Sequence, residues 1–153
     1  MPRTTHDQRA KCRVCQTQLG RYHAYVLTLE QTVTQLSPQP PCHLTCALSD
    51  AEQQAASVGD VFAVWSTKFI PAMVRNELKG GVTEFHLDAP DSIRWIAGDG
   101  KAATYAEIET GFQSALVDIA ARIQSDDESS AIAAQLAALH HFMPTQHKEV
   151  EAP

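Results

Sequence analysis

With 153 residues, of which 44% are hydrophobic, the chain has the length for one domain with a proper core, or for one domain with a small appended module. Twelve Lys and Arg against eighteen Asp and Glu give a net charge of -6. This balance counts against an obligate nucleic-acid binder, which needs a basic face, and a charged fraction of 20% excludes a disordered polyelectrolyte.

The N-terminal segment differs from the rest in charge. Its first 21 residues contain one acid, Asp7, and five cations: Arg3, Arg9, Lys11, Arg13 and Arg21. The first twelve residues, MPRTTHDQRAKC, lack the apolar stretch of a secretion signal, and no apolar run is long enough to span a membrane. We therefore expect a cytoplasmic protein without a membrane segment, whose four cysteines are thiols or metal ligands rather than disulfides.

The first 58 residues predict a zinc knuckle, a strand and a helix. Residues 12–20 place two cysteines in a tight turn, and the aromatic and aliphatic residues of 22–29 predict a strand. The prolines of Ser37-Pro-Gln-Pro-Pro41 end regular structure before a helix predicted over about 42–57, where Ser49 and Glu52 form a further capping pattern. Gly59-Asp60 ends that helix.

The middle of the chain predicts a small antiparallel sheet of three or four strands. The apolar run 61–65 predicts a buried strand, and 69–74 predicts an edge strand or an irregular segment because it contains Pro71. Lys79-Gly-Gly81 predicts a turn between that segment and a strand over 82–87, and 93–96 predicts one more strand.

Two amphipathic helices are predicted in the C-terminal third. Thr104 and Glu107 form a capping box, followed by apolar residues at steps of three and four: Tyr105, Ile108, Phe112, Leu116, Ile119 and Ile123. The segment 125–128, Ser-Asp-Asp-Glu, starts a second helix, whose apolar residues are Ile132, Leu136, Leu139 and Met143. The fold class is therefore α+β: a zinc-binding module over 1–58, an α+β remainder over 59–143 packed with it in one compact domain, and a polar tail over 144–153.

The clearest chemical signal is a pair of Cys/His clusters. Cys12 and Cys15 form a C-x2-C loop, in which two thiolates can face one ion at the tetrahedral angles that Zn2+ accepts. His43 and Cys46 are three residues apart, so on a helical turn their side chains share one face. A knuckle, then β structure, then a helix whose first turn carries the second ligand pair is the order of a treble-clef zinc finger. The sequence predicts one structural zinc ion bound by Cys12, Cys15, His43 and Cys46.

Cys42 leaves an alternative open, because five candidate ligands compete for four positions. A Cys42 and Cys46 pair at i, i+4 would leave His43 outside, although the i, i+3 pair suits a first helical turn better. A catalytic zinc needs an open position, so four protein ligands favour a closed structural site.

Other chemistry finds weaker support in the sequence. The H-x-E and P-C-x-x-C motifs of zinc deaminases are absent: His23-Ala-Tyr25 lacks the glutamate, and three residues separate Cys42 from Cys46. A metal-dependent nuclease or hydrolase would need a histidine base, for which His23 and His86 are the candidates, yet both fit strand positions. No phosphate-binding glycine loop is present.

The chain resembles small proteins encoded by tailed bacteriophages and prophages. The residues that carry the resemblance lie between 12 and about 118: Cys12-x-x-Cys15, Pro40-Pro41-x-His43-x-x-Cys46-Ala47, Trp65-Ser-Thr-Lys68 and Gly100-Lys-Ala-Ala-Thr-x-x-Glu107. In such relatives serine can stand at the position of Cys42, which implies His43 and Cys46 as ligands. Relatives of this kind imply a phage setting and carry over no activity.

Three functions follow as expectations. The first is a non-enzymatic zinc-binding phage accessory protein that acts by protein–protein interaction, in host takeover or counter-defence, within the bacterial cytoplasm. The second is a zinc-finger nucleic-acid-binding protein that uses Arg9, Lys11, Arg13 and Arg21, and the third is a metal-dependent hydrolase. The Ala-rich segment 131–138 is consistent with a homodimer and equally with packing inside one chain.

Overall fold

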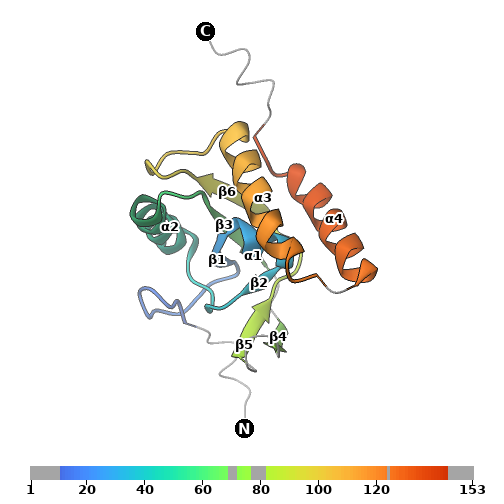
Figure 1. Ribbon diagram of the computed structural model, residues 1–153. Helices are drawn as coiled ribbons and strands as arrows, with labels where there is room; N and C mark the ends of the chain where they lie inside the picture. Colours follow the sequence, from blue (N-terminus) through green and yellow to red (C-terminus); the bar gives the residue numbers. More distant parts are fainter. Residues whose placement is uncertain (1–10, 69–71, 77–81, 124, 145–153) are drawn as a thin grey trace.

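The computed structural model describes residues 11–68, 72–76, 82–123 and 125–144. Within them the element order is β1 (His23–Thr28), α1 (Leu29–Thr34), β2 (Leu36–Ser37), α2 (Leu44–Val58), β3 (Phe62–Thr67), β4 (Ala72–Asn76), β5 (Val82–His86), β6 (Ser92–Ile96), α3 (Tyr105–Ala120) and α4 (Asp126–His140) (Figure 1). The predicted α+β class is confirmed. The predicted turn at 79–81, the start of the segment at 69–74 and the tail beyond Pro144 lie outside the described residues.

The described strands form two antiparallel sheets of three strands each, in the orders β1-β3-β6 and β2-β5-β4. The sequence pattern predicts the later strands but combines them into one sheet. The pairing partners show that there are two sheets. Tyr25 of β1 lies opposite Trp65 of β3, whereas Phe85 of β5 lies between Ser37 of β2 and Met73 of β4. Pairing between residues nearly fifty positions apart leaves no local trace in a sequence.

The β1-β3-β6 sheet is the middle of three layers. Side chains that alternate along β1 and β3 point to opposite faces. One set, including Tyr25, Leu27 and Trp65, packs with α1, α3 and α4, whereas the other set, including Val26 and Val64, packs with α2. Figure 1 shows α2 on one side of this sheet and α3 with α4 on the other.

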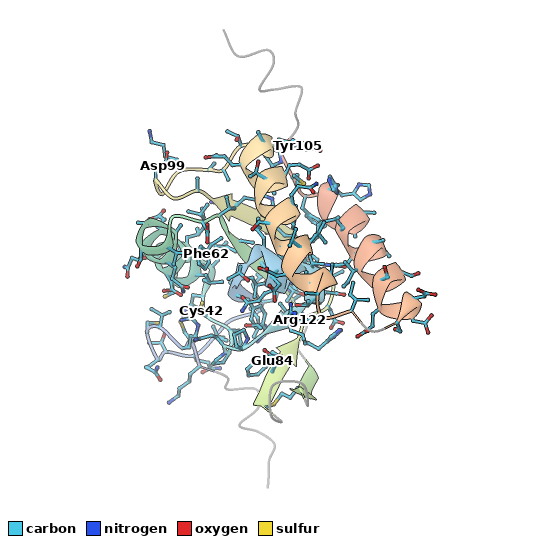
Figure 2. All side chains as sticks on the ribbon, in the orientation of Figure 1. Cys42, Phe62, Glu84, Asp99, Tyr105 and Arg122 are labelled. Atoms are coloured by element: carbon cyan, nitrogen blue, oxygen red, sulfur yellow. The ribbon has the colours of Figure 1, made fainter. Side chains whose placement is uncertain are left out.

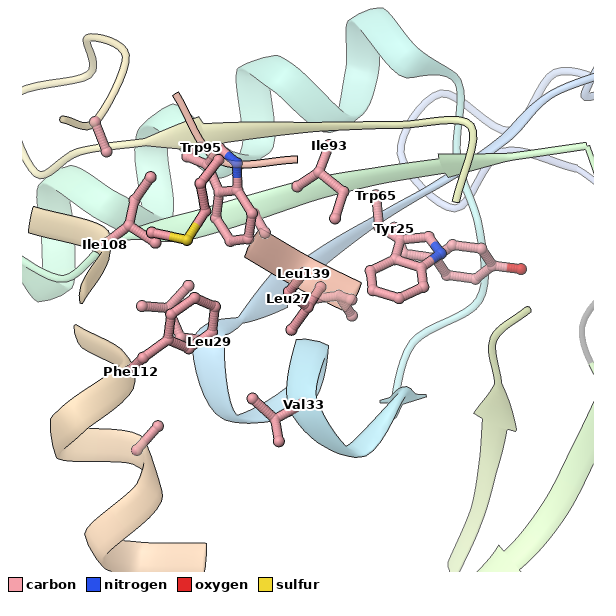
Figure 3. Packing of buried hydrophobic residues seen from close by; sticks show 14 of the residues in the cluster. Tyr25, Leu27, Leu29, Val33, Trp65, Ile93, Trp95, Ile108, Phe112 and Leu139 are labelled. Atoms are coloured by element: carbon pink, nitrogen blue, oxygen red, sulfur yellow. The ribbon is translucent and has the colours of Figure 1, made fainter. Parts of the chain in front are cut away.

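The larger core lies between the sheet and the C-terminal helices (Figure 3). Phe112 of α3 is fully buried and meets Trp95 of β6 edge-on, with ring centroids 5.9 Å apart. The Trp95 indole donates a hydrogen bond of 2.9 Å to the Phe142 carbonyl, which ties the end of α4 to the sheet. Leu139 is also buried, and Ile132 and Leu136 are half-buried against the same core. The predicted apolar stripe of α4 therefore packs within this chain.

Local capping explains where several helices begin and end. Thr104 and Glu107 form the predicted capping box of α3, and Ser125 caps α4 above its acidic first turn. Gly59 ends α2 in the left-handed region, at φ 86, as its position in the sequence predicts. The short helix α1 was not predicted, although the Thr28 hydroxyl and the Gln31 side chain form a capping box at its start.

Candidate metal centre

The first half of the centre is a tight loop that holds Cys12 and Cys15. The Cys12 amide donates to the Thr17 carbonyl at 2.8 Å, and the Gln16 amide donates to the Cys12 carbonyl at 2.9 Å. Gln16 adopts the left-handed conformation, at φ 69, which allows the chain to reverse within five residues. The loop thereby brings both thiols to one side, as the C-x2-C spacing predicts.

The second half comes from the start of α2 and is fixed by strand β1. Cys42 forms an isolated antiparallel bridge with Ala24 through two backbone hydrogen bonds of 2.8 and 2.9 Å. His43 follows as the N-cap of α2, with extended backbone, and Cys46 lies in the first turn of that helix. The Arg13 amide donates to the Pro41 carbonyl at 3.2 Å, which joins the Cys12–Cys15 loop to this segment.

The four predicted ligands meet at one point. Single ligand atoms from Cys12, Cys15, His43 and Cys46 all lie within 4.8 Å of one another. The His43 Nδ1 atom is 3.4 Å from the Cys15 Sγ atom and 3.9 Å from the Cys46 Sγ atom. Tetrahedral zinc, with bonds of about 2.3 Å to sulfur and about 2.0 Å to nitrogen, separates such atoms by about 3.6 Å. The donor set and its spacing therefore fit a tetrahedral metal ion.

Backbone amides surround the buried Cys12 sulfur. The amides of Val14, Cys15 and His43 all point to it, with nitrogen–sulfur distances of 3.4 to 3.5 Å. Burial opposes the charged thiolate, but these three amides, together with the Cys15 side chain, outweigh it and lower the pKa of Cys12 to about 6. The surroundings of Cys12 thus favour its thiolate, the form that binds zinc.

The ring of His43 is oriented by the backbone. Its Nε2 atom lies 3.0 Å from the Gln18 carbonyl oxygen, which can only accept a hydrogen bond. Nε2 therefore carries the hydrogen, and Nδ1 presents its lone pair toward the thiols of Cys15 and Cys46. A backbone carbonyl that fixes the tautomer of a metal-binding histidine is a common feature of zinc sites.

The remaining thiols differ in their surroundings. The Thr17 hydroxyl lies 3.0 Å from the Cys15 sulfur, and hydrogen bonds from Thr17 lower the pKa of this exposed thiol. Burial, followed by the neighbouring Cys12 and Cys15, raises the pKa of Cys46 to about 11. Several thiolates in so small a volume repel one another, and a divalent cation at their centre removes that repulsion.

Cys42 lies outside this group. It is fully buried beside β1, on the side of the molecule where α2 and the N-terminal loop lie (Figure 2), and its sulfur lies 3.5 Å from the Ala24 carbonyl oxygen. Burial raises its pKa to about 12, so it remains a neutral thiol. Of the two arrangements that the sequence leaves open, the structure forms the one with His43.

The basic residues near the loop have different positions. Arg13 forms an ion pair of 2.6 Å with Asp50 of α2, and its side chain is only 18% exposed. Lys11 and Arg21 are exposed, and Arg9 lies outside the described residues. The contact between Arg13 and Asp50 holds the loop against α2, which is a structural role for one of the four predicted nucleic-acid contacts.

The other candidates from the sequence do not form a common site. His23 of β1 and His86 of β5 belong to different sheets. Burial lowers the pKa of the half-buried His23, which favours its neutral form, and His86 is exposed. Trp65 and Trp95 are buried in the core and form no part of a surface site.

Residues that sequence reasoning missed act mainly through their backbone. Gln18 orients His43 through its carbonyl, and Val14 supports Cys12 through its amide. Any residue can supply such groups, so side-chain identity gives no signal for them. Thr17 is different, because a hydroxyl two residues after a ligand cysteine is visible in the sequence.

Comparisons with protein-family models, with curated proteins and with solved structures find nothing that matches this chain. Within the part of the chain that the structure describes, no helix has both the length and the apolar character needed to cross a bilayer. The fold and the centre themselves define the class: an α+β protein with a zinc-finger-like Cys3His group that joins its N-terminal loop to a helix.

Proposed function

We propose that the Cys3His group binds one structural zinc ion and that the protein stabilised by it acts by binding another protein, without catalysing a reaction. The observation that carries the proposal is the closed donor set. Four side chains from two segments converge within 4.8 Å, so a tetrahedral ion keeps no position for water or substrate. The zinc joins the N-terminal loop to α2, two segments that are separated by 27 residues (43 − 15 − 1).

Elemental analysis of the purified protein tests the zinc assignment. We expect one zinc per chain in the wild type and its loss in His43→Ala and Cys46→Ser, because each removes a ligand atom. Cys42→Ser is the matched control, since it changes a thiol of the same segment that lies outside the group, and it is expected to keep the metal. Zinc retained without His43, or lost without Cys42, would contradict this ligand set.

Two exposed apolar residues in the N-terminal part of the described chain support an interaction role. Val14 lies between the two loop cysteines and Tyr22 directly precedes β1, and each side chain is 47% exposed. The net charge of -6 is unfavourable for binding phosphate backbones, which supports a protein partner. The resemblance to proteins of phages and prophages supports a bacterial host as the place to look for it.

Affinity capture from a bacterial host lysate, with the double variant Val14→Ser/Tyr22→Ser for comparison, tests the interaction role. We expect the wild type to enrich a defined protein several-fold over the double variant, because the variant removes the apolar contact area while leaving the ligands in place. Val117→Ser, at an apolar position that is 71% exposed on α3, is the control and is expected to retain the partner. Equal capture by all three proteins, or enrichment of nucleic acid alone, would contradict the proposal.

A further inference from the structure

A cleft of about 710 Å³ lies away from the metal centre, between the start of α1, the turn from α2 to β3, and α3. Its size is within the range of ligand-binding pockets in proteins. Buried apolar side chains of Leu29, Phe62 and Ala115 form its floor (Figure 2 labels Phe62), and the exposed Val58 lies at its edge. The cleft thus offers an apolar surface between three parts of the chain.

The small size of Gly111 contributes to the shape of this cleft. A Cβ atom at Gly111 of α3 would lie 2.3 Å from the Leu29 Cδ1 atom, so only glycine lets α3 approach α1 this closely without displacing that side chain. Both residues line the cleft. Its floor is therefore set by a close helix contact.

The charge that lines the cleft has one sign. The charged lining residues are four acids, Glu30, Asp60, Glu107 and Asp118, with no Lys, Arg or His among them. Glu30 is paired with Arg122 and Glu107 belongs to the capping box of α3, so these two have local roles. Neither Asp60 nor Asp118 serves a helix N-terminus, where acids stabilise helices.

Asp60 and Asp118 instead lie near helix C-termini, where negative charge is unfavourable. Asp60 follows the Gly59 cap of α2, Asp118 is in the last turn of α3, and neither helix has a basic residue in its last turn. The partial negative charge of the α2 terminus, whose Val58 and Gly59 also line the cleft, adds to that of the acids. An apolar floor beneath such a negative rim matches a ligand with an alkyl chain that ends in a cation.

We propose that this cleft binds an arginine or lysine side chain of a partner protein. The proposal rests on the proposed function and gives the chemistry of the partner: the alkyl part of such a side chain covers the apolar floor, and its cationic end is attracted by the acidic rim to which Asp60 and Asp118 belong. A free polyamine also carries cationic groups on an alkyl chain, but it has no flanking peptide that could pack against the exposed Val58. We therefore assign the cleft to a segment of a protein.

Titration of the zinc-loaded, isotope-labelled protein with blocked tripeptides, followed by amide chemical shifts, tests this assignment. The probes are Ala-Arg-Ala, Ala-Lys-Ala, Ala-Leu-Ala and Ala-Glu-Ala, with spermidine as the non-peptide cation. We expect the two basic peptides to shift the amide signals around Gly59, Gly98 and Gly111. Added salt is expected to weaken the binding of both peptides. Asp60→Asn and Asp118→Asn are each expected to lower the affinity about two- to fivefold. Asp91→Asn, at the opposite end of β6, is expected to leave it unchanged.

Three results would overturn the assignment: no shifts with the basic peptides, equal shifts with Ala-Leu-Ala or Ala-Glu-Ala, or tighter binding of spermidine than of Ala-Arg-Ala. Failure here is distinguishable from failure of the proposed function. A partner that is still captured in the Val14 and Tyr22 experiment, while the peptides do not bind, refutes the cleft and leaves the interaction role intact.

Discussion

Replacing Cys12 by serine is expected to remove the zinc and to lower the free energy of unfolding by about 4 kcal/mol. This is the contribution of a ligand that binds only the folded state at about 1,000 times its dissociation constant. Cys12 is the buried ligand, and three amides point at its sulfur, so a hydroxyl there leaves these donors with a poorer acceptor. Urea unfolding at a fixed free zinc concentration measures the loss, and the melting temperature is expected to fall by about 8 to 16 °C.

Cys42→Ser and chelation of the wild type are the matched controls for Cys12→Ser. A serine hydroxyl at position 42 can still donate to the Ala24 carbonyl, so this variant is expected to keep the zinc and most of the stability. A strong chelator should bring the wild type to the stability of Cys12→Ser and change that variant little. A wild type whose unfolding midpoint is insensitive to the chelator would refute a structural role for the zinc.

The ligand set illustrates what spacing in the sequence does and does not predict. The C-x2-C loop and the i, i+3 pair are local patterns, and both ligand pairs meet as predicted. The choice between Cys42 and His43 is decided by a longer-range contact. The bridge between Cys42 and Ala24 directs that thiol into the core beside β1, so that the next residue faces the loop. Spacing alone keeps both arrangements open because it contains no information about β1.

The same distinction applies to the fold. The helices that begin at Tyr105 and Asp126 were predicted because their caps and apolar steps are local signals. The helix α1 was missed because Thr32, Val33 and Thr34 are β-branched and disfavour helices, whereas its packing against α3 and α4 supplies the stability. The split into two sheets likewise depends on pairing across long intervals of the chain. Tertiary contacts decided each of these features.

Truncating Phe112 to alanine is expected to lower the free energy of unfolding by about 3 to 5 kcal/mol, the range for a buried phenylalanine. Phe112 is fully buried in the larger core, where its ring meets Trp95 and belongs to the cluster that joins α3, α4 and the sheet (Figure 3). The substitution removes that edge-on contact and creates a cavity that fixed neighbours cannot fill. Urea unfolding of the zinc-loaded protein measures the effect.

Val117→Ala on the same helix is the control for Phe112→Ala, because Val117 is 71% exposed and its loss is expected to cost less than about 0.5 kcal/mol. Zinc content should stay at one per chain in both variants, since the smaller cluster around α2 and Cys12 lies on the other face of the β1-β3-β6 sheet. Zinc lost together with Phe112 would mean that the two faces unfold as one unit. Retained zinc with reduced stability would show that the centre keeps its own local structure when the larger core is weakened.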